Sequence, residues 1–183
     1  VTAFSVPKGA LAGWKDRLGR LGVAGLSDAE AFGEARLDFL GPDGDQFALI
    51  EREDSRAPWT GGGVDGSIAI RGFHSVSMRV REEEPTAELL RFMGYEKVGR
   101  QGRTARFAVP HGNGADVVEL EVLPEAPSAE QGAGSVHHVA FAVEDRATQL
   151  EVRKALADAG YQVTPVIDRD YFWAIYFRTP GGV

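Results

Sequence analysis

The chain has 183 residues, of which 26% are charged and 43% hydrophobic, a balance typical of a globular protein with a buried core. Its net charge of −7 argues against a nucleic-acid partner, and the absence of cysteine excludes disulfides and thiolate metal sites. No apolar run approaches the ~20 residues that cross a bilayer, so we expect no membrane partner and a cytoplasmic location. Because the sequence lacks an initial methionine and stops just after a turn, we expect an internal fragment of a longer protein.

Residues 1–56 are expected to form a first structural module of one strand, one helix and further strands. A short alternating run is followed by apolar residues at helical spacing, and the sequence GPDGD between two later strands is typical of a tight turn. The predicted elements are a strand over 2–6, a helix within 7–22 whose apolar face includes Leu21, and strands over 36–40 and 47–50.

Residues 57–72 break this pattern and are expected to form a linker over the surface. They contain Pro58 and three consecutive glycines, Gly61 to Gly63. A phosphate-binding loop is the alternative for these glycines, but the surroundings lack the strand-loop-helix context and the lysine that such a loop uses.

Residues 73–126 repeat the first module. After a strand over 73–80, Pro85 opens a helix and Gly94 closes it, with four apolar residues facing inward: Leu89, Leu90, Phe92 and Met93. Strands follow over 95–98, 104–109 and 117–122, and residues 127–135 are expected to form a second linker.

Residues 136–183 are expected to form a third module that lacks its last strand. The run VHHVAFAVED (136–145) predicts a strand, Asp145 caps a helix over 146–159, and strands follow over 161–166 and 171–178. The fold class is therefore α+β, with repeated βαβββ modules forming curved, half-barrel mixed sheets and helices on the outside. The open sheet edge predicts either a homodimer or local disorder.

His138 is the residue that this repeat singles out for chemistry. It shares a strand phase with Ala140 and Ala142, on a face left roomy, whereas the opposite phase is bulky and apolar. A histidine in that position is placed to reach a ligand or metal, although a core histidine bonded to backbone is the alternative. His74 falls in the opposite phase and is expected to be a satisfied, partly buried histidine, and His111 is expected to be a solvated turn residue.

Four stretches of the chain resemble one family. The modules are similar to those of the vicinal oxygen chelate superfamily, which includes glyoxalase I, bleomycin-resistance proteins and extradiol dioxygenases. The stretches GSVHHVAFAVED, VIDRDYFWAIYFRTPGGV, RAPWTGG and IRGFHSVSMRV resemble its ring-cleaving dioxygenases of the hydroquinone type. The resemblance implies a full-length Fe(II)-dependent dioxygenase that cleaves a dihydroxylated aromatic, a hydroquinone or catechol, with dioxygen. Mn(II), Ni(II) and Zn(II) are the alternative metals.

The resemblance also implies roles for individual residues. His138 would be a metal ligand, while a second histidine and a glutamate would lie outside this chain, so the 183 residues alone are expected to be inactive. His137, Arg169 and Tyr176 would act beside the metal, on protons or on an anionic substrate oxygen. The alternatives are that Arg169 only pairs with its neighbouring aspartates and that Tyr176 only packs in the barrel wall.

Two other functions stay open on the sequence alone. A glyoxalase-type lyase or isomerase with Ni(II) or Zn(II) commonly uses two carboxylates, for which Glu119 is the available candidate. A metal-free small-molecule binding protein, such as an antibiotic-sequestering relative, needs no histidine, so His138 weighs against it. The first module, with Ala48 at the corresponding position, is expected to be structural.

Overall fold

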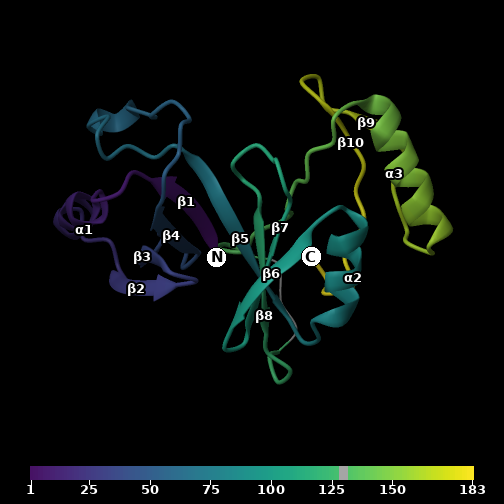
Figure 1. The fold of residues 1–183 in the computed structure, drawn as a ribbon, viewed down its shortest axis with the longest axis horizontal. Helices are drawn as coiled ribbons and strands as arrows, with labels where there is room; N and C mark the ends of the chain where they lie inside the picture. The colour runs from purple at the N-terminus through teal and green to yellow at the C-terminus, as the bar shows by residue number, and fades with distance from the viewer. Residues whose placement is uncertain (128–131) are drawn as a thin grey trace. The chain divides into compact units, whose positions relative to one another are not determined.

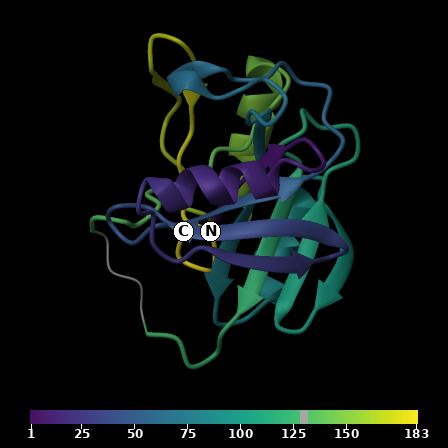
Figure 2. The ribbon, with the colours of Figure 1, turned by 90° about the vertical axis from the view of Figure 1, so that its left-hand side faces the viewer.

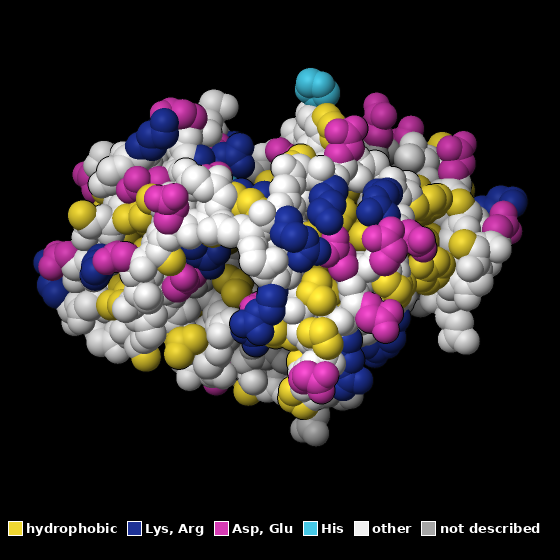
Figure 3. Space-filling view, turned by 60° about the horizontal axis from the view of Figure 1, so that its bottom comes forward, with side chains coloured by type: hydrophobic (Ala, Val, Ile, Leu, Met, Phe, Trp, Pro, Cys, Tyr) yellow, Lys and Arg dark blue, Asp and Glu magenta, His cyan; other side chains and the backbone are white. Residues whose placement is uncertain are grey.

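The computed structural model describes residues 1–127 and 132–183, and these form two compact units, Val1–Val136 and His137–Val183. Part of the second predicted linker, residues 128–131, lies outside the described residues. No helix in the described ranges is both long and apolar enough to cross a bilayer. Figure 3 shows acidic and basic side chains interspersed on one face.

The described residues of the first unit form one eight-stranded sheet and two α-helices in a repeated order of strand, helix and three strands, with a short 3-10 helix, η1 (Gly61–Gly63), between the repeats (Figure 1). The first repeat consists of β1 (Thr2–Val6), α1 (Leu11–Arg20), β2 (Ser27–Ala31), β3 (Glu34–Leu40) and β4 (Gln46–Glu51). The second repeat consists of β5 (Gly72–Val80), α2 (Glu84–Phe92), β6 (Glu96–Gln101), β7 (Thr104–Ala108) and β8 (Val117–Val122).

The two repeats are joined at the centre of the sheet by their first strands. The strand order is β2-β3-β4-β1-β5-β8-β7-β6, with β1 and β5 antiparallel. Each first strand also pairs in parallel with the last strand of its own repeat, β1 with β4 and β5 with β8. The sheet curls into a half-barrel with α1 on its outer side (Figure 2), so the predicted fold class is confirmed.

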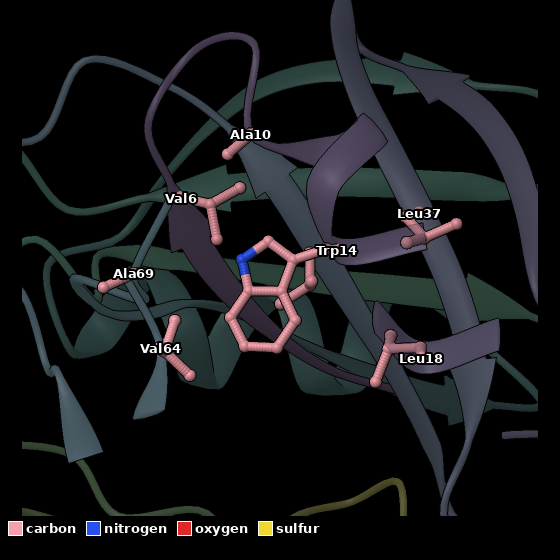
Figure 4. Packing of buried hydrophobic residues seen from close by; sticks show 8 residues of the cluster. Val6, Ala10, Trp14, Leu18, Leu37, Val64 and Ala69 are labelled. Atoms are coloured by element: carbon pink, nitrogen blue, oxygen red, sulfur yellow. The ribbon is translucent and has the colours of Figure 1, made fainter. Parts of the chain in front are cut away.

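Trp14 anchors the core between α1 and the sheet (Figure 4). It is 7% exposed, and its indole Nε1 donates a hydrogen bond of 2.7 Å to the carbonyl of Ile68. Val64 and Ala69, from the segment predicted to be a surface linker, are buried in the same cluster. That segment is therefore not only a surface connection, because apolar residues between its glycines cover the end of the core. The cluster consists of Val6, Ala10, Trp14, Leu18, Leu37, Leu49, Val64 and Ala69.

Other predictions for the first unit were wrong in detail. The strand β2 was missed because its sequence, SDAEA, is polar and lies at the edge of the sheet, where no apolar face is needed. Leu21 and Phe92 were predicted to face inward but are 68% and 51% exposed, because both lie at the last turn of a helix. The predicted helix ends are correct, since Gly22 and Gly94 adopt positive φ there.

The second unit contains α3 (Arg146–Asp158) and a short hairpin of β9 (Ile167–Asp168) and β10 (Trp173–Ala174). The helix was predicted, but no strand forms over 136–145. The strand predicted over 161–166 is replaced by the two residues of β9 that follow it, and the strand predicted over 171–178 is reduced to the two residues of β10 within it. In the first unit the equivalent strands β1 and β5 have a partner on each side. The described residues offer the 136–145 segment no such partner, and alternation alone does not make a strand without one.

Candidate metal and substrate site

His137 and His138 lie in the segment without regular structure that precedes α3, and both side chains are exposed. Their Nδ1 atoms are 3.0 Å apart and their rings are perpendicular. A hydrogen bond at this distance requires one Nδ1 to carry a proton and the other to accept it. The described residues make no hydrogen bond to Nε2 of His138, so that nitrogen is available to a ligand.

Tyr176 and Arg169 come from the hairpin of the second unit and extend this pair. The ring of Tyr176 meets the ring of His138 edge-on at 6.2 Å between centroids, and the Arg169 guanidinium lies 5.4 Å from the Tyr176 centroid. The structure therefore brings all four predicted site residues into one continuous group, His137–His138–Tyr176–Arg169. Arg169 makes no ion pair among the described residues, so its charge is available on that face of the ring.

The hairpin and α3 hold these side chains through backbone-directed hydrogen bonds. Tyr176 donates its N–H to Thr164 Oγ1 at 3.0 Å, and its carbonyl accepts from the Thr164 N–H at 3.0 Å. Arg169 donates its N–H to the Phe172 carbonyl at 2.9 Å, closing the turn between β9 and β10. From α3, Gln149 Nε2 donates to the Trp173 carbonyl at 2.8 Å, so the helix fixes the hairpin behind the site.

The described residues do not complete a metal site by themselves. Within residues 1–127 and 132–183, no group of three histidine, aspartate or glutamate side chains lies close enough together to hold a metal ion. The site residues supply two imidazoles, one guanidinium and one phenol, so no carboxylate compensates the charge of a divalent cation. This donor set fits a part of an iron site rather than the whole of one.

The first unit has a cavity of its own with different chemistry. Ser77 and Arg79 of β5 line this cavity of about 490 Å³ together with Glu119 of β8. His111 is exposed in its turn, as predicted. His74, predicted to be partly buried and satisfied, is 1% exposed and lies 3.1 Å through Nε2 from Glu34 Oε1.

Sequence reasoning missed the ion network around His74. Arg106 donates to Glu34 Oε2 at 2.5 Å through Nη1 and to Glu119 Oε1 at 2.7 Å through Nη2. Burial alone would raise the pKa of Glu34, but hydrogen bonds from His74 and Arg106 outweigh it and hold the pKa at about 2. The available signal was a charged residue, Arg106, inside the otherwise buried strand TARFA.

Comparison with known proteins identifies the family of this chain. Residues 20–183 match the family model described as the Glyoxalase/Bleomycin resistance protein/Dioxygenase superfamily. The chain belongs to this superfamily. It is 40% identical over 185 residues to MhqO of Bacillus subtilis (strain 168), which is named as a ring-cleaving dioxygenase, covering 100% of this chain and 58% of that protein. It is 34% identical over 190 residues to the chlorohydroquinone/hydroquinone 1,2-dioxygenase of Sphingobium indicum, covering 99% and 59%.

A solved superfamily structure extends this likeness to three dimensions. The crystal structure of a dioxygenase from Bacillus subtilis subsp. subtilis str. 168 matches with a TM-score of 0.91 at 40% identity, over 98% of this chain and 58% of that one. The predicted family resemblance is thus confirmed. The chain spans a little under three fifths of the length of each of these three proteins. The dioxygenase activity in their names is therefore proposed, and not established, for the protein that contains this chain.

Proposed function

We propose that the whole protein is an Fe(II)-dependent ring-cleaving dioxygenase whose substrate is a dihydroxylated aromatic of the hydroquinone or catechol type, with dioxygen as co-substrate. The observation that carries this proposal is the gathering of His137, His138, Tyr176 and Arg169 into one group. The dioxygenase names of the relatives at 40% and 34% identity give the reaction class. We expect the protein to act in the cytoplasm.

In this proposal His138 is one of three protein ligands to the metal. Its Nε2 makes no hydrogen bond to the described residues, and its Nδ1 contacts His137, so the nitrogen that would not bind metal is the one that orients the ring. The second histidine and the glutamate would come from residues outside the 183. Iron, when bound, would supply open coordination positions for an aromatic oxygen and dioxygen, and Mn(II), Ni(II) or Zn(II) are the alternative ions.

The other three residues would handle the substrate and its protons. Arg169 carries a charge without a carboxylate partner among the described residues, which suits it to hold an anionic phenolic oxygen. Tyr176, with Arg169 over its ring, presents a phenol beside His138 and can donate a hydrogen bond. His137, in contact with His138, can accept a proton as the aromatic hydroxyl ionises.

The iron content and turnover of variants of the full-length protein test these roles. We expect His138→Ala to lose iron and activity, whereas His137→Ala keeps iron and loses about 10²–10⁴-fold in turnover, the usual contribution of a general base. His111→Ala is the matched control, because this histidine is exposed in a turn of the first unit and is not among the predicted site residues. Equal iron in wild type and His138→Ala would show that the wrong histidine was chosen.

The 183 residues by themselves provide a second test. With one of three expected ligands, they should retain no stoichiometric iron and should not cleave a hydroquinone or catechol panel above an iron-only blank. Measurable cleavage by the fragment would mean that the residues present are sufficient. A glyoxalase-type enzyme would instead convert a thiohemiacetal without dioxygen, so oxygen consumption separates the two activities.

A further inference from the structure

A polar side chain occupies a core position of α3. The helix buries Gln149 and Leu156, which are seven positions apart and therefore lie on the same face. Leu156 is 1% exposed and Gln149 is 8% exposed. An amphipathic helix usually has apolar residues at such positions, so the glutamine is an exception that packing does not explain.

One half of the Gln149 amide is satisfied and the other half is not. Its Nε2 donates a hydrogen bond of 2.8 Å to the carbonyl of Trp173, whereas its Oε1 is buried and has no hydrogen-bond partner among the described residues. A buried acceptor without a donor costs free energy, and an apolar side chain of similar length would avoid that cost. The bond to Trp173 is what such a side chain could not provide.

This bond acts on the segment that carries Tyr176. Trp173 lies three residues before Tyr176, and Tyr176 exchanges two hydrogen bonds with Thr164, through its N–H and its carbonyl. Arg153, one turn after Gln149 on α3, donates its Nε to the Thr164 carbonyl at 2.8 Å. Two side chains of one helix face thus hold the two segments that meet at Tyr176.

The same bond joins the two parts of the proposed site. His138 lies on the segment that leads into α3, whereas Tyr176 and Arg169 come from the hairpin. The ring of Tyr176 lies 6.2 Å from the ring of His138, and the Arg169 guanidinium lies 5.4 Å from the Tyr176 ring, both measured to centroids. The distance between the hairpin and α3 therefore sets how these side chains face His138. A misplacement of about 1 Å can lower the turnover of an enzyme about 100-fold.

We propose that Gln149 is a positioning residue of the dioxygenase site, which holds Tyr176 and Arg169 against His138 through the carbonyl of Trp173. This inference rests on the proposed function for its consequence in turnover. The Arg146 guanidinium lies 4.8 Å from the centroid of the Trp173 ring, and this contact does not involve Gln149. Without Gln149 the hairpin should therefore stay attached to α3 but move more freely against it.

Amide hydrogen exchange of the 183-residue chain tests the positioning without any reaction. Gln149→Met keeps an unbranched side chain of similar length but removes both the donor and the unpaired oxygen. In this variant the amides of Thr164 and Tyr176 should exchange about 10-fold faster than in wild type, whereas the amide of Leu156 should change by less than about 2-fold. The matched control is Leu150→Met, at a position of α3 that is 48% exposed, and it should change none of the three rates. Unchanged exchange at Thr164 and Tyr176, or an equal increase at all three amides, would overturn the proposal.

Turnover of the full-length protein tests the consequence. With a hydroquinone, kcat should fall about 10- to 100-fold in Gln149→Met, while the iron content and the Tm stay at the wild-type values. Gln149→Glu should show a similar loss of kcat at about pH 8, because it keeps the size of the side chain but its ionised carboxylate cannot donate to a carbonyl. Arg146 and Arg153, which flank this position on the helix, favour the ionised form.

The two measurements separate this inference from the proposed function. A wild-type kcat in either variant, or a loss of Tm without a loss of kcat, would overturn the positioning role. Absence of ring cleavage by the wild-type full-length protein would instead refute the proposed function, and the amide exchange of Thr164 and Tyr176 would then decide the positioning role by itself.

Discussion

The first segment of the repeat forms a paired strand in the first unit but no strand in the second. In the first unit β1 and β5 pair with each other and with the last strand of their own repeats, so their backbone groups are satisfied on both sides. In the second unit residues 137–143 belong to no strand in the described part of the chain. An alternating sequence therefore provides an apolar face that can be buried, but a strand forms only where neighbouring strands provide its backbone hydrogen bonds.

The same contrast applies to the polar side chains on these strands. On the first unit's concave face, Glu34, Arg106 and Glu119 satisfy one another in a buried network. In the second unit, His137 and His138 are exposed, and Arg169 has an aromatic neighbour but no carboxylate among the described residues. A closed network of ion pairs stabilises a fold, whereas polar groups without an ion-pair partner are available to bind a ligand.

Hydrogen exchange should show the largest difference between the two regions. Amides of β1 and β5 exchange only when the sheet opens, whereas the amides of residues 137–140 make no hydrogen bond within the described part of the chain. We expect at least about a 1,000-fold difference in protection, since global stability of 5 kcal/mol or more sets the slower rate. Mass spectrometry of peptides from both regions measures it, and comparable protection of 137–140 would show that the segment pairs in solution.

Removal of a buried aromatic from the first unit should have the next largest effect. Phe107 is fully buried on β7, directly opposite Val118 of β8. Phe107→Ala should lower the free energy of unfolding by about 3–5 kcal/mol, through lost burial and the cavity that remains. Phe92→Ala is the matched control, because Phe92 is 51% exposed at the end of α2, and it should change stability by less than about 1 kcal/mol. Chemical denaturation followed by circular dichroism compares the two, and similar losses would contradict the assigned core.

The secondary structure could be predicted from sequence more fully in the first unit than in the second. The first strands and the repeated order of elements in the first unit were predicted from the alternation of apolar residues. The ends of the two helices were predicted from Gly22 and Gly94. The polar edge strand β2 could not be predicted, because its pairing comes from β3 rather than from its own pattern. Residues 161–178 show the opposite error, since strand-like alternation there forms only the two-residue strands β9 and β10.

The candidate sites divide in the same way. The predicted group of His137, His138, Arg169 and Tyr176 lies together in the second unit, and its chemical roles stay predictions. The ion network around Arg106 could not be predicted, because Glu34 and Arg106 are 72 positions apart in sequence. Only the curl of the sheet and the β2–β3 hairpin bring them together, and no local pattern encodes that contact.

Acid should weaken the first unit through Glu34. Its pKa is lowered from the usual 4.5 to about 2, so its ionised form stabilises the fold fully above about pH 4.5 and progressively less as pH falls towards 2. Allowing for solvent screening of a side chain that is a quarter exposed, we expect about 1–2 kcal/mol. Urea denaturation between pH 2 and 6 measures this term as a difference between wild type and Glu34→Gln. A constant difference across that range would show that Glu34 is not the titrating group.

The smallest effect should come from the N-terminus of α3, which is capped by the side chain of Asp145. Asp145 Oδ1 accepts the N–H of Thr148 at 2.8 Å, and the hydrogen bonds from Thr148 hold the pKa of Asp145 below its usual value. Because the ionised carboxylate is the form that is favoured in the folded chain, its contribution is present above about pH 4 and is lost as pH falls further. Asp145→Ala should therefore increase hydrogen exchange in the first turn of α3 at neutral pH. Asp145→Asn keeps the cap without the charge, so it should exchange like wild type at neutral pH and lack the acid-induced increase. Equal exchange at Thr148 in wild type and Asp145→Ala would mean that the helix begins without help from this cap.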